Sequence, residues 1–410
     1  MTYIEFFDKD AVENICSGLI NPPDQIVLVG DKAKEMAEHA RRYEKIFAER
    51  GHQVVARYRG INRNNLGNIV DTLSDIVENW DDCVFDLTGG DELYLVALGI
   101  VYARYPEKKI RMHRINIRNN TLIDCDQDGV TIFDGELPPI TVRENIRIYG
   151  GDIVYDDVKE GGTHRWDMTE EFRADIGTMW EICREDPREW NRQIGVLVDA
   201  EECFDGGAGS QTTVAPAEKV PSRYGNRFGE QTVIRALLEA GLITELRVDE
   251  NLTVTYKDEQ VKRCLVKAGQ VLEMKVLSAA MNCREKDGAP TYDDAVNGVM
   301  IDWDGVMRPG RVDTENEIDV LMTHGMVPVF VSCKNGYVEV NELFKLNTVA
   351  EQFGGKYAKK VLIVSELDED DPHTKALRQR ADDMDIRIVA NLKHTSDSEL
   401  ERVIRSLWLN

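Results

Sequence analysis

Two charged residues near the C-terminus, Asp319 and Lys334, have types and a spacing that suit phosphodiester chemistry. Each lies in an apolar stretch that predicts a strand, Asn316–Met322 for the acid and Val327–Lys334 for the lysine. An acid on one strand can bind a divalent cation, and a lysine ending the next strand can steady an attacking water or developing negative charge. The pair therefore predicts metal-assisted phosphodiester hydrolysis, although a solvated strand face with unrelated charges would look the same.

The strand pattern predicts which side chains accompany this pair. Side chains alternate along a strand, so Glu317 should share a face with Asp319, and Ile318 and Val320 should take the opposite face. A further strand, Val299–Asp304, precedes these two. Asp302 and Asp304 share one of its faces and are additional candidate acids.

Helices predicted around these strands complete an α/β sandwich. Apolar residues at near-fourfold spacing predict one long helix over Val261–Ala280, with Glu273 beside its apolar stripe. The final helix begins at Ser396, which opens a capping box with Glu399. Between them the sequence predicts the helices Val340–Phe353 and Thr374–Met384 and the strands Ala358–Val364 and Ile386–Ala390.

Length and composition bound the class of protein. At 410 residues the chain is too long for one compact core, which predicts two or three domains. A net charge of −24 argues against a general nucleic-acid coat protein, but it permits a nuclease whose metal ions and a local basic patch meet the phosphate. No apolar run approaches the roughly 20 residues of a membrane span, and no export signal is visible. The eight cysteines lack CxxC spacing, so we expect a cytoplasmic protein without zinc or disulfides.

Residues 1–150 alternate strands and helices, which predicts a Rossmann-like domain with a parallel sheet. The predicted strands are Tyr3–Phe7, Gln25–Val29, Gln53–Tyr58, Asp82–Leu87 and Lys109–Asn116, and the predicted helices are Ala11–Leu19, Ala33–Arg50, Asn65–Trp80 and Leu93–Tyr105. Ligands bind such sheets beyond the carboxyl ends of the strands. Two glycine-containing loops lie there, Gly30-Asp31-Lys32 and Thr88-Gly89-Gly90-Asp91-Glu92. No GxGxxG is present, so a dinucleotide cofactor is not supported.

Residues 151–258 predict a linker with a small helix and hairpin element. Residues 121–160 predict hairpins and connections, Glu170–Asn191 a helix, and Gly206–Ser222 a loop or linker. Glu230–Glu239 predicts a helix, and a hairpin over residues 244–256 would make a winged-helix-like unit with it. It lacks a cluster of arginines, so we expect a structural or coupling role rather than DNA reading.

At this point the chain resembles a known family. The helix with Glu273, then NEIDVL, VFVSCKNG and ELFKLNTVAEQFGGKYAKK, resembles a PD-(D/E)XK restriction-endonuclease-like domain over residues 259–410, in its DUF1887 branch. Those proteins join such a nuclease to an N-terminal CARF domain, the sensor module of type III CRISPR antiviral defence. IEFFDKDAVENI, QIVLVGD and FDLTGGDE are similar to that sensor, so the resemblance spans nearly the whole chain.

The resemblance implies a homodimer that binds a cyclic oligoadenylate, most often cyclic tetra-adenylate, across its two sensor sheets. Binding would reposition nuclease domains that cut DNA, or RNA, with Mg²⁺ or Mn²⁺. By position, Asp319 would be the metal-binding acid, Lys334 the catalytic lysine and Glu273 the helix acid that completes the site, with Glu317 as an extra ligand. In the sensor, the ligand-binding residues would be Thr88, Gly89, Gly90, Asp91 and Glu92, together with Gly30, Asp31, Lys32 and Asn14.

One position departs from the family pattern. Ser332 stands two residues before the lysine, where the family has Glu or Asp, and a hydroxyl brings no charge to a hard cation. Glu342 on the following helix could supply the missing acid, or the carbonyl of Cys333 and water could fill the gap. Weak activity is a third possibility, and the alternative function is therefore a cyclic-oligonucleotide sensor or binding protein whose nuclease fold is degenerate. A transcription regulator using residues 230–256 would need a basic recognition helix, which is absent.

Overall fold

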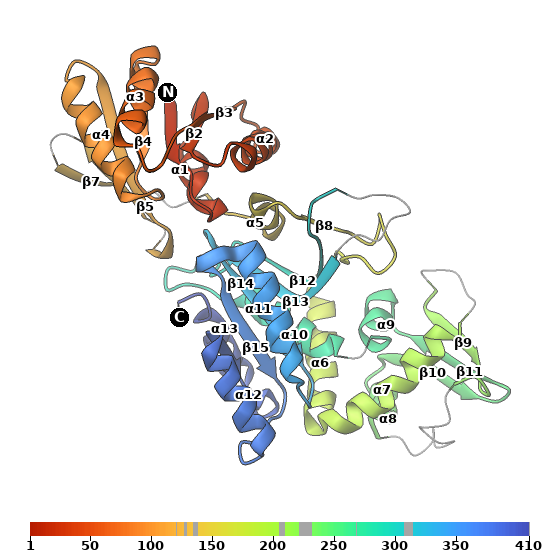
Figure 1. Cartoon of the computed structure of the whole chain (residues 1–410). Helices are drawn as coiled ribbons and strands as arrows, with labels where there is room; N and C mark the ends of the chain where they lie inside the picture. Colours follow the sequence, from red (N-terminus) through yellow and green to blue (C-terminus); the bar gives the residue numbers. More distant parts are fainter. Residues whose placement is uncertain are drawn as a thin grey trace.

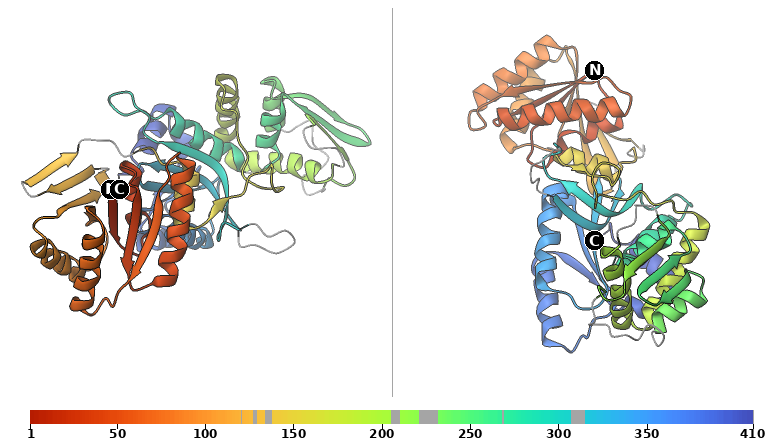
Figure 2. Two further views of the ribbon diagram at one scale, coloured as in Figure 1. Left: turned by 90° about the horizontal axis from the view of Figure 1, so that it is seen from above. Right: turned by 90° about the vertical axis from the view of Figure 1, so that its right-hand side faces the viewer.

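In the part of the chain that the structure describes, the fold contains three sheets of seven, three and six strands (Figure 1). This computed structural model describes residues 1–119, 121–126, 129–133, 138–204, 210–220, 232–267, 269–306 and 315–409. The seven-stranded sheet stands at one end of the molecule, the six-stranded sheet follows, and the three-stranded sheet lies beside the latter (Figure 2). Within the described residues, no helix is both long and apolar enough to span a membrane.

The N-terminal sheet has the order β3-β2-β1-β4-β5-β6-β7, and β1 to β5 are parallel. Alternate strand residues enter two separate cores, with Ile26 and Leu28 on one face and Val27 and Val29 on the other. α1 and α2 cover the first face, and α3 and α4 cover the second. The predicted Rossmann-like arrangement is confirmed. Its elements are β1 Thr2–Phe6, α1 Cys16–Ile20, β2 Gln25–Gly30, α2 Ala33–Glu49, β3 Val55–Gly60, α3 Leu66–Asn79, β4 Asp82–Asp86, α4 Glu92–Arg104, β5 Lys109–Asn116, β6 Thr121–Asp126 and β7 Gly129–Phe133.

Two N-terminal segments differ from the sequence prediction. The first predicted helix begins as a 3₁₀ turn, η1 (Ala11–Asn14), before α1. The segment predicted as hairpins contains the hairpin β6–β7, but also α5 (Val142–Tyr149), which begins at a capping box between Thr141 and Glu144. β8 (Asp152–Ile153) then pairs with the C-terminal sheet rather than with the N-terminal one.

Two long helices predicted from periodicity are each divided in two. Pro187 begins a new helix after Asp186, so the predicted Glu170–Asn191 helix is α6 (Glu170–Glu185) followed by α7 (Pro187–Glu202). Proline lacks the N–H that a helix interior needs, which forces the break. The predicted 261–280 helix is α9 (Glu259–Leu265) and α10 (Gln270–Asn282), because Gly269 adopts a positive φ of 85° between them.

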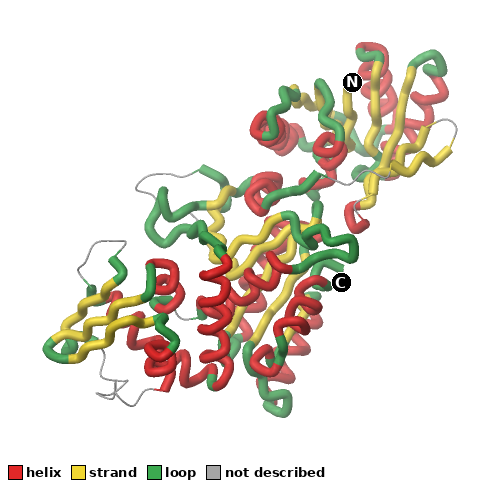
Figure 3. Tube along the Cα trace, turned by 180° about the vertical axis from the view of Figure 1, so that it is seen from behind, coloured by secondary structure: helices red, strands yellow, loops and turns green. Residues whose placement is uncertain are grey.

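The three-stranded sheet has the order β10-β11-β9 and packs with α8 (Thr232–Glu239). Its strands are β9 Thr212–Pro216, β10 Ile243–Val248 and β11 Asn251–Tyr256. The segment 206–222, predicted as a loop or linker, contains the strand β9, so that prediction is corrected. Residues 206–209 and 221–222 of this segment lie outside the described residues, as do residues 230–231 of the predicted helix Glu230–Glu239. The hydrophobic core of this unit continues into one face of the C-terminal sheet. The unit lies beside that sheet (Figure 3).

The C-terminal sheet is the predicted α/β sandwich. Its order is β16-β15-β14-β13-β12-β8; β12, β13 and β14 are antiparallel, and β14, β15 and β16 are parallel. α10 and α13 pack on one face, and α11 and α12 on the other. The elements are β12 Asp294–Asp302, β13 Glu315–His324, β14 Val327–Lys334, α11 Val340–Gly354, η5 Gly355–Tyr357, β15 Lys359–Val364, α12 Pro372–Asp383, β16 Ile386–Val389 and α13 Asp397–Arg405.

Candidate functional site

Asp319 lies where β13 and β14 separate. Their residue pairing runs from His324↔Val327 to Val320↔Val331. Beyond that pair, Asp319 Oδ2 accepts a hydrogen bond from the backbone N–H of Cys333 at 2.6 Å and from Ser332 Oγ at 3.1 Å. The carboxylate is thereby fixed at the mouth of the opening between the strands, with 17% of its side chain exposed.

The predicted alternation of faces on β13 is wrong at this point. Ile318 packs in the core under α11, whereas Val320 packs in the core under α10, although regular alternation would place both on one face. Gly298 on the neighbouring strand β12 has a positive φ of 58°, a conformation that favours glycine. The distortion changes the relative orientation of the acidic side chains on β13. Sequence periodicity does not predict this distortion.

Lys334 links Asp319 to α11. Its Nζ lies 3.5 Å from Asp319 Oδ2 and 2.9 Å from Glu342 Oε2. Burial acts to lower the pKa of Lys334, but the two carboxylates outweigh it, so the pKa is raised and the ammonium stays charged. Glu342 also accepts from Lys345 at 2.7 Å, and it therefore serves Lys334 rather than standing free as an acid in the cavity.

Glu273 stands behind Asp319 in a buried amide network. Asn297 Nδ2 donates to Glu273 Oε2 at 2.7 Å and to the backbone carbonyl of Asp319 at 2.9 Å, and Gln270 Nε2 donates to Glu273 at 3.3 Å. Burial, with a further contribution from the charge of Asp319, raises the pKa of Glu273 to about 7. The negative charges of Glu273 and Asp319 oppose each other when both are ionised, a condition that a bound cation would relieve.

Lys267 is a site residue that the sequence prediction missed. Its ammonium forms an ion pair with Glu317 Oε1. Burial acts to lower its pKa, but the charges of Glu273, Glu317 and Asp319 raise it. The sequence prediction missed Lys267 because this residue lies next to the break between α9 and α10, where periodicity predicts one continuous helix.

Asp319, Lys334 and Glu342 line a cavity of about 480 Å³. Its wall includes five predicted site residues, namely Glu317, Asp319, Ser332, Lys334 and Glu342. Glu273, Asp302 and Asp304 are not part of that wall, and Asp304 lines a different cavity with Arg42 and Gly150.

The donor set suits a cation that keeps part of its water. Among the described residues, no group of three or more His, Cys, Asp or Glu side chains is arranged to hold a metal ion. Mg²⁺ commonly binds through one or two carboxylates and completes its shell with water and substrate phosphate. The carboxylates of Asp319 and Glu273 are therefore the kind of protein ligands that Mg²⁺ uses. Ser332 donates a hydrogen bond to Asp319 rather than serving as a metal ligand.

The predicted ligand loops of the N-terminal sheet meet at the carboxyl ends of β1, β2 and β4. Arg63, which the sequence prediction missed, reaches both loops, with Asp91 at 3.1 Å and Asp31 at 4.0 Å. Gly90 has a φ of 100°, and a Cβ there would lie 2.6 Å from Cβ of Phe6. Glycine is therefore required for the backbone to turn this close to β1.

The remaining predicted loop residues have structural partners. Asp91 caps α4, Thr88 Oγ1 donates to Asp86 and accepts from the N–H of Ile115, and Lys32 pairs with Glu35 at 3.0 Å. Asn14 is fully buried, and its amide accepts from the N–H of Asp8 at 2.7 Å and donates to the Asp8 carbonyl at 2.8 Å. Asn14 thus fixes the loop after β1 rather than presenting a free polar group.

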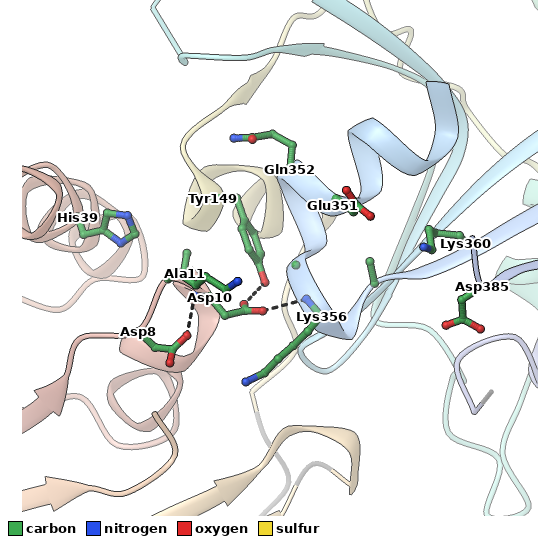
Figure 4. Close-up of a pocket in the computed structure, with 13 residues that line it drawn as sticks. Asp8, Asp10, Ala11, His39, Tyr149, Glu351, Gln352, Lys356, Lys360 and Asp385 are labelled. Carbon is green, nitrogen blue, oxygen red and sulfur yellow. Dashed lines mark hydrogen bonds between the residues drawn. The ribbon is translucent and has the colours of Figure 1, made fainter. Parts of the chain in front are cut away.

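The loop after β1 joins the end of α11 in a contact we call the junction, formed by Asp10, Glu13, Tyr149, Lys356 and Tyr357. Asp10 accepts from the backbone N–H of Lys356 at 2.9 Å and from Tyr149 Oη at 2.6 Å (Figure 4). The buried carboxylate of Glu13 accepts from Tyr357 Oη and pairs with Lys356 Nζ at 2.7 Å.

The junction borders a cavity of about 740 Å³ between the N-terminal and C-terminal sheets. Figure 4 shows Asp8 and Asp10 on the N-terminal side of this cavity and Glu351, Lys356 and Lys360 on the C-terminal side. α11 therefore connects two sites: its first turn carries Glu342 beside Lys334, and its last turn leads into the junction.

Comparison with known proteins supports the fold. No family model and no curated protein sequence matches the chain. Protein VC1899 from Vibrio cholerae is similar in structure, with a TM-score of 0.70 at 14% identity over 99% of this chain and 97% of that one. Can2 from Sulfobacillus thermosulfidooxidans, solved with cyclic tetra-adenylate, gives a TM-score of 0.63 at 13% identity over 100% and 99%.

A third similar structure is a type III CRISPR defence DNA nuclease activated by cyclic oligoadenylate. It gives a TM-score of 0.50 at 15% identity over 91% of this chain, and the match covers 46% of that protein. At these identities the likeness is one of fold. The predicted α/β fold is confirmed, and the likeness to the first two structures extends along the whole chain.

Proposed function

We propose that this protein is a divalent-metal-dependent nuclease activated by a cyclic oligoadenylate, cyclic tetra-adenylate in the first instance, and that it acts in type III CRISPR defence as a homodimer. The observation that carries the proposal is the Asp319–Lys334–Glu342 arrangement beside Glu273, in a chain that shares its fold with Can2 over its full length. Can2 was solved with the ring, and the third similar protein is a DNA nuclease.

The chain's own residues have distinct tasks in this proposal. Asp319 and Glu273 would hold Mg²⁺ or Mn²⁺, and the cation would supply Lewis-acid chemistry at the scissile phosphate. Lys334 remains protonated beside Asp319 and stabilises the negative charge that develops on the phosphate oxygens. Glu342 orients the lysine, and the hydrogen bonds of Cys333 and Ser332 orient Asp319.

Activation by the ring would act through α11. The loops after β1, β2 and β4 form the proposed ring site, and the loop after β1 continues into Asp10 and Glu13 of the junction. A ligand that shifts this loop would move the C-terminal end of α11, whose N-terminal turn holds Glu342 against Lys334. A ring bound across two such sheets would place the two chains of a dimer in contact.

A ring-binding protein without cleavage is the second candidate, because Ser332 donates a hydrogen bond where the related pattern has a carboxylate. One experiment distinguishes the two. Supercoiled plasmid and labelled RNA are incubated with the protein, with and without Mn²⁺ and with tetra- or hexa-adenylate rings. Cutting that requires both metal and ring supports the nuclease, whereas ring binding with no cutting under any metal supports the second candidate.

A further inference from the structure

A further cavity lies at the segment that follows the candidate catalytic lysine in the chain. Its volume is about 860 Å³, and Asn335, Gly336 and Tyr337, which continue the chain from Lys334, form one wall. The opposite walls come from α7, the start of α12 and the segment after β16. The cavity therefore lies beyond the carboxyl ends of the parallel strands β14, β15 and β16, where α/β sheets commonly bind ligands.

An aromatic pair stands in this cavity wall. The rings of Tyr337 and His373 are stacked with centroids 5.0 Å apart and an interplanar angle of 18°. The side chain of His373 is held in place because its Nε2 donates to the carbonyl of Val338 at 2.8 Å. Tyr337 is 75% exposed, so a large ring face is left uncovered although its neighbours fix it in position.

Exposed aromatic rings on rigid supports are platforms on which nucleobases stack. Tyr337 is not a core residue, because its side chain is 75% exposed and its stacking partner His373 is itself only half-buried. Gly336, with a φ of 115°, makes the turn that brings Tyr337 from the end of β14 into the cavity wall. Tyr337 lies three residues after Lys334 in the chain, so a base stacked on it would belong to the same strand as a phosphate held by Asp319 and Lys334.

Polar groups in the cavity suit the rest of a nucleotide. Arg188 is exposed on the wall, and no described carboxylate lies within ion-pair distance of it, so its guanidinium can receive a phosphate. The other cation, Lys393, is paired with Glu366 at 2.6 Å. The carboxylates of Asp368 and Asp371 also line the cavity, which limits the number of phosphates it can accept.

Asparagine amides form the cavity floor behind the aromatic pair. Asn335 Nδ2 donates to Asn191 Oδ1 at 2.9 Å, and Asn335 Oδ1 is buried with no hydrogen-bond partner. This oxygen is closed off from solvent, so the asparagine pair fixes the turn after β14 that carries Tyr337.

We infer that this cavity is a base-stacking subsite for the nucleic acid substrate, in which Tyr337, supported by His373, holds an unpaired base next to the scissile phosphate. The inference rests on the proposed nuclease function and deepens it. The same base chemistry is present in the cyclic oligoadenylate, so the test must distinguish the substrate strand from the ring.

The test measures cleavage of a labelled single-stranded oligonucleotide with Mn²⁺ and saturating cyclic tetra-adenylate. Loss of one stacked base weakens binding by about 5- to 150-fold, so Tyr337→Ala should raise KM by that factor and leave kcat nearly unchanged. Tyr337→Phe keeps the ring and should stay within about twofold of the wild-type KM. The ring concentration giving half-maximal activation should be the same in all three proteins.

Each other result overturns the inference in a recognisable way. An unchanged KM for Tyr337→Ala removes the subsite while leaving the nuclease proposal intact. A shift in the ring concentration for half-maximal activation, with KM unchanged, assigns the base to the activator instead. If the wild-type protein neither cuts nor binds the oligonucleotide under any metal, the proposed function falls and the subsite falls with it.

Discussion

Breaking the junction should uncouple the ring site from the nuclease site. The change we consider is Lys356→Met, which removes the cation that neutralises Glu13 and keeps most of the side-chain length. The Glu13 side chain is 2% exposed and Lys356 is 56% exposed, so the pair is buried on the acid side and solvated on the lysine side. Removing one partner of a fully buried pair costs about 3–5 kcal/mol, and exposed pairs contribute about 0–1 kcal/mol.

For this half-buried pair we expect an intermediate loss of about 1–2 kcal/mol of interaction free energy. This loss should appear as lost free energy of coupling between the ring site and the nuclease site. That corresponds to a decrease of about 5- to 30-fold in the ratio of cleavage rates with and without cyclic tetra-adenylate. Gly355→Ala should have the same direction of effect by a different route, because its new Cβ would overlap the Asp10 carboxylate at a φ of 55°.

The assay is cleavage of a labelled oligonucleotide at saturating ring and in its absence, with the ring dissociation constant measured separately. Lys34→Met is the matched control, because Lys34 is exposed on α2 and lies outside the junction. Both junction variants should still bind the ring. An unchanged activation ratio in Lys356→Met and Gly355→Ala, with ring binding intact, would refute transmission through α11.

Two further predictions concern the acids and the glycine loop. The folded-state pKa of Glu273, raised to about 7 from an ordinary value of 4.5, means that the folded protein binds the extra proton between these values. In EDTA the free energy of unfolding should therefore fall as pH rises from about 5 to 8, and Glu273 should account for roughly 2–3 kcal/mol of the fall. The thermal midpoint of Glu273→Gln should fall less over this range than that of the wild type. An equal fall in both proteins would contradict the raised pKa of Glu273. Gly90→Ala forces a side chain into a left-handed conformation against Phe6, so the ring dissociation constant should rise by about 5- to 150-fold while cleavage at saturating ring persists. Calorimetric titration of the ring measures this, and wild-type affinity would exclude that loop from the ring site.

Much of the fold follows from local patterns. β14 spans the predicted residues Val327–Lys334, and α11 and α13 begin at the predicted positions to within one residue. These elements combine a strong apolar pattern with clear end signals, so local chemistry and tertiary packing agree. The prediction of one helix over 261–280 was wrong because the apolar periodicity continues in phase across Gly269. The sequence prediction missed α5 because its capping box precedes only eight helical residues.

The site was only partly predictable. The sequence identifies Asp319 and Lys334 as a pair, because an acid and a lysine lie on successive predicted strands. It does not show that Glu342 holds the lysine, that Asn297 links Glu273 to the Asp319 carbonyl, or that Lys267 enters the acidic group. Those contacts depend on the switch of faces near Gly298 and on helix placement, and neither leaves a periodic trace in the sequence.

The most direct test of the account compares wild type with Asp319→Ala and Lys334→Ala in one assay. Each protein receives labelled DNA or RNA, Mn²⁺ and cyclic tetra-adenylate, and ring binding is measured in parallel. The account predicts ring-dependent cutting by the wild type, a loss of at least about 100-fold in both variants, and unchanged ring binding in all three. Full cutting by either variant would contradict the site, and a wild type that binds the ring and cuts nothing would contradict the nuclease itself.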